Sequence, residues 1–279
     1  MSSSVLAGQV AVVTGASRGI GRQVALHLSE RGAAVGAVAR AGAALTGLPE
    51  EAARAGGRLR AIAADVTVHA EVEGAFAAVE AALGPVTLAV ACAGTEGPLG
   101  PLHRADPEAW WRAVEVDLRG SMLTARAALK RMVGSGRGRL VLVYGNLGDR
   151  LGAHVSAFAA AKAAVARVTE VLAGEVDGSG VGVFGIHPGF VRTPLTERLA
   201  WGDDGRAWLP GFGRGVEDRW GDGRPAADLV EAIALGRADD LSGRILHAGD
   251  DLAELAERCR ADPDLRRLRL QWDPPADAH

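Results

Sequence analysis

The chain has 279 residues, of which 48% are hydrophobic and 23% charged, with a formal net charge of −3. This composition predicts a globular domain with one substantial core, and 31 basic against 34 acidic residues leave no basic excess for a nucleic acid or a membrane surface. Two cysteines exclude a disulfide framework, and there is neither a basic leader nor a run of about 18 apolar residues, so we expect a cytoplasmic protein.

Short runs rich in β-branched residues alternate with alanine-rich segments of helical length along the chain. This alternation predicts strand-helix-strand units around a parallel sheet. We expect strands near 9–14, 34–39, 58–63, 86–92, 139–144, 181–187 and 244–248. The predicted fold class is therefore α/β, a Rossmann-like doubly wound fold with a seven-stranded parallel sheet and helices on both faces. Ligands of such sheets bind beyond the carboxyl ends of the strands.

The first predicted strand leads directly into a glycine-rich turn, Thr14-Gly-Ala-Ser-Arg-Gly-Ile-Gly21, and then into a helical pattern. Glycines permit a tight turn and close backbone approach, and the start of the helix offers unpaired amide groups to an anion. The turn therefore predicts a pyrophosphate site. The residues that we expect around the pyrophosphate are Gly15, Ser17, Arg18, Gly19, Ile20 and Gly21.

The end of the second predicted strand indicates which dinucleotide binds. A carboxylate there would bond the ribose 2′-hydroxyl and repel a 2′-phosphate, but this strand ends at Arg40, and Arg18 lies in the turn nearby. Two guanidinium groups without a carboxylate favour NADP(H) over NAD(H) as the cofactor.

The spacing Thr-Gly-x-x-x-Gly-x-Gly near the N-terminus resembles the short-chain dehydrogenase/reductase family, and the resemblance continues along most of the chain. The pair Asp65 and Val66 follows the third predicted strand, as the family's adenine-contacting pair does. Two further segments resemble the end of the family's Asn-Asn-Ala-Gly and its Pro-Gly-x-x-x-Thr beside the nicotinamide. The resemblance therefore implies nucleotide contacts from Asp65, Val66, Ala93, Gly94, Lys162, Pro188, Gly189, Val191 and Thr193.

The sequence departs from the family in the catalytic pattern. In the family a tyrosine exchanges a proton with the substrate oxygen, a lysine lowers the pKa of that tyrosine and holds the nicotinamide ribose, a serine positions the oxygen, and an asparagine anchors a proton-relay water. The resemblance places these four positions, in the same order, at Phe158, Lys162, Gly145 and Asp117, so only the lysine is kept. Losing a positioned general acid costs roughly 10²- to 10⁴-fold in rate, so the ordinary family reaction is not expected.

Three interpretations of this departure remain open. The protein could reduce an electrophile that needs no proton from the enzyme at the moment of hydride transfer, such as an iminium ion or a quinone-like system. Alternatively, another residue could supply the proton beside Lys162. The candidate substitute acids are Tyr144, His154, Asp117 and Asp149. In the third interpretation the scaffold catalyses a redox-neutral cyclisation, dehydration or isomerisation, or it serves as a non-catalytic binding subunit.

One segment before the last predicted strand breaks the alternating pattern. Between about residues 196 and 225 the chain is rich in Gly, Asp and Arg and contains three of its six tryptophans. Long irregular connections are usually lids or disordered segments, and tryptophans argue against disorder, so we expect an irregular lid over the substrate. The predicted wall of the substrate pocket consists of Phe158, Asn146, Phe190, Trp201 and Trp208. The whole chain, 1–279, is then one dinucleotide-binding domain with a surface extension at about 263–279.

An apolar side chain at position 158 under a tryptophan-bearing lid suits a hydrophobic, flat or polycyclic small molecule. The alanine, glycine and arginine bias is typical of GC-rich genomes, in which diverged reductases of this kind often act in secondary metabolism. Family members commonly pair through the helix that here carries Phe158 and many alanines, so the resemblance implies a homodimer or homotetramer. The sequence predicts no metal site, and neither nucleic acid nor membrane as a partner.

Overall fold

Seven parallel strands form one sheet in this computed structural model, which describes residues 4–145, 152–214, 218 and 220–268. The strands are β1 (Val10–Thr14), β2 (Ala34–Ala39), β3 (Arg58–Ala63), β4 (Leu88–Ala91), β5 (Gly138–Val143), β6 (Val181–His187) and β7 (Ile245–His247). Each lies within two residues of its predicted bounds. The strand order β3-β2-β1-β4-β5-β6-β7 confirms the predicted Rossmann-like fold. From β1, the strands β2 and β3 are added on one side and β4 to β7 on the other, so the strand order reverses between β1 and β4.

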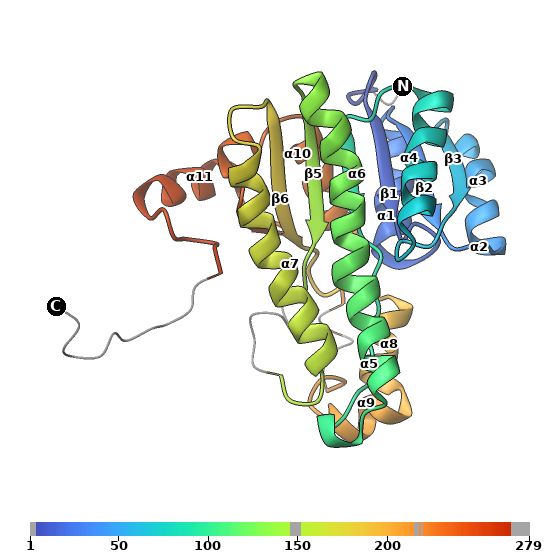
Figure 1. Ribbon diagram of the computed structural model, residues 1–279, viewed down its shortest axis with the longest axis vertical. Coiled ribbons are helices and arrows are strands. Elements are labelled where there is room, and N and C mark those ends of the chain that lie inside the picture. The colour runs from blue at the N-terminus through green and yellow to red at the C-terminus, as the bar shows by residue number, and fades with distance from the viewer. Residues whose placement is uncertain (1–3, 146–151, 215–217, 219, 269–279) are drawn as a thin grey trace.

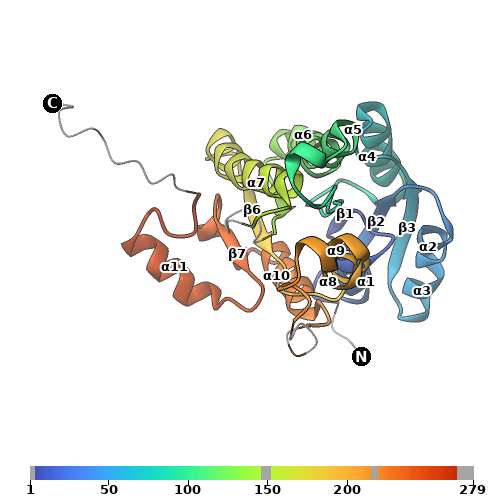
Figure 2. The ribbon, with the colours of Figure 1, turned by 90° about the horizontal axis from the view of Figure 1, so that it is seen from below.

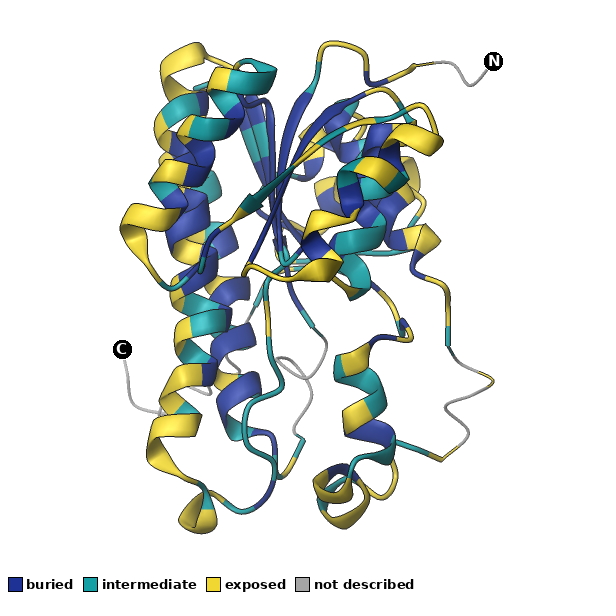
Figure 3. Ribbon diagram, turned by 90° about the vertical axis from the view of Figure 1, so that its right-hand side faces the viewer, coloured by how far each residue is buried: buried dark blue, intermediate teal, exposed yellow. Residues whose placement is uncertain are grey.

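Two layers of helices cover the sheet, and the central strands between them are buried, whereas the edge strand β3 is partly exposed (Figures 2 and 3). The first layer is α1 (Gly19–Glu30), α2 (Ala43–Thr46), α3 (Leu48–Arg54), α10 (Arg224–Ala234) and α11 (Leu252–Ala261). The second layer is α4 (His69–Leu83), α6 (Gly120–Ser135) and α7 (Ser156–Glu175). Every position of β1, β2 and β4 is buried, as expected for strands covered on both faces.

The remaining helices lie beyond the carboxyl ends of the strands, where α7 also projects past the sheet (Figure 1). They are α5 (Pro107–Val114), α8 (Pro194–Trp201) and α9 (Asp203–Trp208). A π-helical turn, Glu115–Arg119, joins α5 to α6. The segment predicted as an irregular lid therefore differs from expectation, because two short helices build much of it.

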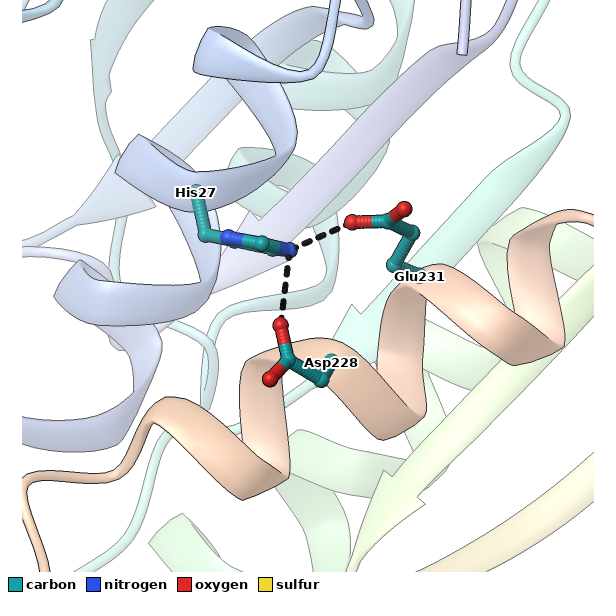
Figure 4. A group of neighbouring side chains, drawn as sticks. All are labelled: His27, Asp228 and Glu231. Carbon is teal, nitrogen blue, oxygen red and sulfur yellow. Dashed lines mark hydrogen bonds and ion pairs between the residues drawn. The ribbon is translucent and has the colours of Figure 1, made fainter. Parts of the chain in front are cut away.

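Helix α1 is tied to α10 by a group of ionisable side chains (Figure 4). His27 is buried, and its Nε2 lies 2.7 Å from Glu231 Oε2 and 3.5 Å from Asp228 Oδ1. Arg31 bonds both oxygens of Glu231, at 2.9 and 3.0 Å, and Arg224 bonds Asp228 at 2.8 Å. Because guanidinium groups already occupy these carboxylates, we interpret the group as a link between two helices and not as a metal site.

The first residues of the predicted surface extension, 263–268, contact the body of the protein. The backbone N–H of Ile245 donates to Arg266 O at 3.0 Å, so the chain after α11 hydrogen-bonds to β7 at the edge of the sheet. The buried Arg244 donates to Leu265 O at 2.7 Å, and Leu268 packs beside Tyr144. Residues 263–268 are therefore attached to the body of the protein, and 269–279 lie outside the described residues.

In the described part of the chain, none of the helices is long and apolar enough to span a membrane.

The contact between β2 and α4 depends on the absence of a side chain at Gly36. A Cβ added there would overlap the Cγ2 methyl of the fully buried Val79. We predict that Gly36→Ala lowers the free energy of unfolding by about 1–3 kcal/mol, as overpacking of a core does. Urea unfolding measures this loss. The loss caused by Gly36→Ala should be smaller in a chain that already carries Val79→Ala than in the natural chain. Equal losses in the two backgrounds would contradict this packing.

Candidate functional site

A cleft of about 1030 Å³ opens beyond the carboxyl ends of the strands, at the reversal of strand order. Its walls come from the glycine turn after β1, the loops after the next strands, α5, α7, α8 and Phe212 of the lid segment. This is the place at which doubly wound sheets bind their ligands.

The glycine turn forms one end of the cleft because it packs directly on the loop after β4. A Cβ at Gly15 would lie 2.8 Å from the backbone of Ala93, and one at Gly21 would lie 2.6 Å from the carbonyl oxygen of Gly15. The hydroxyl of Thr14 accepts hydrogen bonds from the backbone N–H groups of Cys92, at 3.1 Å, and Ala93, at 3.4 Å. These contacts hold the two loops together, and only glycine fits at either position in the turn.

Helix α1 begins at the end of this turn with its first amide groups available to a ligand. Its N-cap residue Arg18 makes no side-chain cap, and the first turn contains no acidic residue. The turn, the helix start and the cleft therefore fit the pyrophosphate of a dinucleotide.

All the residues predicted to contact the nucleotide line this one cleft. They are Gly15, Ser17, Arg18, Gly19, Ile20, Gly21, Arg40, Asp65, Val66, Ala93, Gly94, Lys162, Pro188, Gly189, Val191 and Thr193. They come from six separate segments of the chain, so the sheet is what assembles them.

Charges at the nucleotide end are arranged with two exposed cations and one fixed anion. Within the described residues, neither Arg18 nor Arg40 has an ion-pair partner, and both are exposed. The carboxylate of Asp65 accepts hydrogen bonds from Thr67 N, at 2.9 Å, and Thr67 Oγ1, at 2.7 Å. These bonds, and to a smaller extent the charges of Arg40 and Arg112, hold the pKa of Asp65 below its usual value.

Phe158 and Lys162 lie one helical turn apart on α7, and both side chains are buried against the cleft. The ammonium Nζ of Lys162 donates to the carbonyl oxygen of Val143 at 3.1 Å. It also lies 5.6 Å from the centroid of the Phe158 ring, within cation–π range. The end of β5 and the aromatic ring therefore fix the position of the ammonium group.

The Phe158 ring also occupies the space beside Gly145. A Cβ at position 145 would lie 3.2 Å from Phe158 Cζ and 3.4 Å from its Cε1. The phenyl ring at 158 and the missing side chain at 145 are thus one packing arrangement, in which the ring fills the volume next to the glycine.

Asp117 lies in the π-helical turn and is completely buried, so it sits behind the cleft wall. Its Oδ1 accepts a hydrogen bond from Thr95 N at 2.7 Å, whereas its buried Oδ2 has no hydrogen-bond partner among the described residues. Gly94 separates the carboxylate from the cleft: a Cβ there would lie 3.2 Å from Asp117 Oδ1 and 3.6 Å from Lys162 Nζ. The glycine therefore lets the acid and the ammonium group approach the same point.

Burial raises the pKa of Asp117 to about 6. The charge of Lys162 and the hydrogen bond from Thr95 act in the opposite direction, and the negative charge of Glu96 adds to the rise. Near neutral pH this carboxyl group can therefore take up and release a proton.

The other candidate acids lie in different surroundings. Tyr144 is buried, lines the cleft next to Gly145, and packs with Ala166 and Ile245. His154 has a positive φ of 74°, and its ring lies 5.1 Å from that of Trp208. Among the described residues, His154 is not part of the cleft lining. Asp149 lies outside the described residues.

Of the residues predicted for the substrate wall, the two phenylalanines, Phe158 and Phe190, line the cleft, but among the described residues the two tryptophans, Trp201 and Trp208, do not. Trp201 packs edge-on against Trp220, with ring centroids 4.5 Å apart, and Trp208 packs on His154. Asn146 lies outside the described residues.

Several lining residues have no counterpart in the sequence prediction. Phe212 comes from the lid segment, and its ring lies 5.2 Å from that of Phe190. Leu199 of α8, Thr95 after β4 and Arg112 of α5 also line the cleft. No motif marks them, because only the packing of the lid segment and α5 brings them to the cleft.

The parallel sheet, the glycine turn and the cleft at the strand reversal define a dinucleotide-binding α/β protein. The sequence profile described as short chain dehydrogenase matches residues 9–203. With this match over most of its length, the chain belongs to the short-chain dehydrogenase/reductase family, whose members use NAD(P).

Three similar proteins show the range of this family. The cis-4-hydroxycyclohexanecarboxylate dehydrogenase of Sinomonas cyclohexanicum is 39% identical over 69% of this chain and 77% of its own length. The short-chain reductase protein NovJ of Streptomyces niveus is 33% identical over 85% of this chain and 91% of its own. A crystal structure of an actinorhodin polyketide ketoreductase variant with NADPH is 28% identical over 90% and 99% of the two chains, with a TM-score of 0.79.

The raised pKa of Asp117 predicts a specific dependence of stability on pH. The folded protein holds this proton up to a pH of about 6, whereas an unperturbed carboxyl group loses it near 3.8. The unfolded state binds fewer protons between these two values, so this residue's contribution to stability falls as the pH rises, by about 1.4 kcal/mol per unit.

Urea unfolding of the natural protein and of Asp117→Asn at several pH values measures this effect. The difference in free energy of unfolding should shift in favour of the variant between about pH 4 and 6 and stay constant at higher pH. A difference that is independent of pH in this window would contradict the buried, titrating carboxyl group.

Proposed function

We propose that this protein is an NADP(H)-dependent reductase that acts on hydrophobic small molecules, including polycyclic ones, in secondary metabolism. In this proposal it uses Lys162 and the buried Asp117 in place of the family's tyrosine. The observation that carries the proposal is the buried carboxyl group of Asp117 behind a cleft that suits a dinucleotide: its Oδ2 is unpartnered among the described residues, and its Oδ1 and Lys162 Nζ both face the space at Gly94.

The nucleotide end of the cleft supports NADP(H) in two ways. The glycine turn and the start of α1 would hold the pyrophosphate, and Asp65 and Val66 would contact the adenine. Arg18 and Arg40 are exposed at the same end without an ion-pair partner in the described residues, so both guanidinium groups are available to a 2′-phosphate.

A bound NADPH supplies hydride. The chain must then hold a proton near the substrate oxygen, and the proton-bearing side chains that line the cleft around Phe158 and Gly145 include Lys162 and Tyr144. In this proposal Lys162 donates a proton from Nζ to the oxygen on which negative charge develops. The neutral amine that remains regains a proton from the Asp117 carboxyl group through a bridging water, because these two described side chains make no direct ion pair, and Asp117 then takes up a proton from solvent.

Asp117 is suited to this second role because it is buried and ionises near neutral pH. A proton held by an acid whose pKa lies near the working pH can move in both directions without a large barrier. Since Asp117 lies behind Gly94 and does not reach the cleft itself, it acts through Lys162 and not on the substrate.

The opposite part of the cleft favours an apolar ligand. Phe158, Phe190, Leu199 and Phe212 contribute apolar surface, and two of the rings lie 5.2 Å apart. Such a wall suits the flat face of an aromatic or polycyclic compound. Similarity to an actinorhodin polyketide ketoreductase and to NovJ supports a substrate class of this kind and a place in secondary metabolism.

The packing of Phe158 against Gly145 favours one second candidate, a redox-neutral cyclase, dehydratase or isomerase. This pair removes both the hydroxyl group that would protonate an oxygen and the one that would position it. In such an enzyme the bound nucleotide is not consumed, which makes the two candidates separable by experiment.

We predict that the protein binds NADPH more tightly than NADH, by on the order of 10-fold, because a 2′-phosphate forms charge-assisted bonds with guanidinium groups. Arg40→Ala should remove most of this preference. Arg54→Ala is the matched control, since Arg54 is an exposed arginine of α3 that pairs with Glu50 outside the cleft. Isothermal titration calorimetry measures the affinities, and equal affinities for the two nucleotides would exclude this assignment.

Single-turnover reduction tests the chemistry. With NADPH bound and a bicyclic aromatic ketone such as α-tetralone as the probe, whose oxygen must take up a proton, the near-ultraviolet absorbance of the reduced nicotinamide should disappear. Asp117→Asn should keep NADPH affinity and lower the rate by on the order of 10²-fold, whereas Phe158→Tyr should raise it, because a phenol beside Lys162 is a positioned acid. A rate unaffected by Asp117→Asn would refute the proton route. Conversion of a natural substrate without loss of NADPH would favour the redox-neutral candidate.

A further inference from the structure

The lid segment leaves the body of the protein and returns to it at one closed neck. Val191 and Gly221 form a parallel bridge, in which Gly221 N donates to Phe190 O at 2.8 Å and Arg192 N donates to Gly221 O at 3.3 Å. The guanidinium group of Arg192 lies 5.7 Å from the ring of Trp201 and 5.1 Å from that of Trp220. The neck thus holds both ends of the segment together, and α8 and α9 extend from it.

At a distance from this neck, α8 is attached to the opposite wall of the cleft. Arg198 of α8 makes two parallel bonds to Glu96 of the loop after β4: Nη2 lies 2.8 Å from Oε2, and Nε bonds Oε1. The Glu96 side chain is 14% exposed and that of Arg198 is 47% exposed. The pair joins segments 102 residues apart, and it is stronger than an ordinary surface pair because it is bidentate and partly buried.

The loop that receives Arg198 is also the loop that holds Asp117. Thr95, the residue before Glu96, donates its backbone N–H to Asp117 Oδ1 at 2.7 Å. The Thr95 hydroxyl lies 3.5 Å from Glu96 Oε2. A shift of Glu96 would therefore move the amide group that fixes the buried carboxylate.

We propose that Glu96 and Arg198 are positioning residues: their ion pair fastens α8 across the substrate end of the cleft and, through Thr95, holds the carboxylate of Asp117 in place. Leu199, next to Arg198, brings an apolar side chain to the cleft wall when the pair is formed. Closing the lid and setting the buried acid are then the same event. The part concerning Asp117 rests on the proposed function, and the attachment of the lid does not.

Hydrogen exchange of the full-length protein, with and without saturating NADPH, tests the attachment without any substrate. Arg198→Gln and Glu96→Gln should each accelerate exchange of the α8 amides and of the Thr95 amide by roughly 3- to 10-fold, the effect of losing one partly buried ion pair. The double variant should be no faster than either single one. Exchange that is unchanged in α8, or faster in α8 alone with Thr95 unaffected, would overturn the proposal.

Arg139→Gln is the matched control. Arg139 of β5 bonds Asp239 in the same bidentate manner, at 2.8 and 2.7 Å, but at the opposite end of the sheet from the cleft. This variant should leave the exchange of α8 and of Thr95 unchanged. Faster exchange of α8 and Thr95 in this control would show a general loosening of the protein, which would count against the attachment of α8 through Glu96 and Arg198.

The Thr95 amide resonance provides a readout that loosening alone would not produce. Since this amide bonds Asp117, its chemical shift follows the ionisation of that carboxyl group, on which the charges of Lys162 and Glu96 act. Glu96→Gln removes a negative charge and should lower the titration midpoint. Arg198→Gln leaves Glu96 uncompensated and should raise it. Midpoints that move in the same direction in both variants would overturn the coupling to Asp117.

These readouts separate the inference from the proposed function. If exchange and titration behave as expected but the probe is not reduced, the attachment of α8 through Glu96 and Arg198 stands and the assigned chemistry fails. If reduction depends on Asp117 while substitution of Glu96 or Arg198 leaves the exchange of α8 unchanged, the chemistry stands and the attachment of α8 through this ion pair is refuted.

Discussion

Asp117 and Lys162 carry opposite charges into a region from which water is largely excluded, and the backbone around them has to accommodate both. Burying a charge is costly unless it finds a partner, so each group is held by one backbone group: Thr95 N for the carboxylate and Val143 O for the ammonium group. A glycine at position 94 is what lets the two groups approach from opposite sides. The loop after β4, the end of β5 and the π-helical turn all take their positions around this pair.

The aromatic ring at position 158 completes that environment. It covers the ammonium group at cation–π distance and fills the volume beside Gly145, so the site is drier than it would be with two hydroxyl groups in the same places. The pKa of Asp117 rises because burial withdraws water from its charged form, and this effect outweighs the attraction of Lys162 and the hydrogen bond from Thr95.

Composition alone did not predict where the tryptophans of the lid segment lie relative to the cleft. These tryptophans suggested a substrate wall, but Trp201 packs on Trp220 at the neck and Trp208 packs on His154. Large aromatic rings bury apolar area wherever two segments meet, and at the neck the packing of Trp201 on Trp220 buries such area. The cleft takes its apolar surface from Phe158 and Phe190, which the sequence predicts for the substrate wall, and from Phe212 and Leu199, which no motif marks.

The local sequence determined the seven strands, the glycine turn and the residues at the nucleotide end, because alternation of strands and helices and the need for glycine at close approaches are properties of short segments. It also determined that Phe158, Gly145 and Asp117 stand where they do along the chain. Only the tertiary structure decided that the ring and the glycine share one volume, that Asp117 lies behind Gly94 with one oxygen unpartnered, and that Glu96 meets Arg198. These relations join residues far apart in sequence, and burial, which sets the acidity of Asp117, exists only once the chain has folded around it.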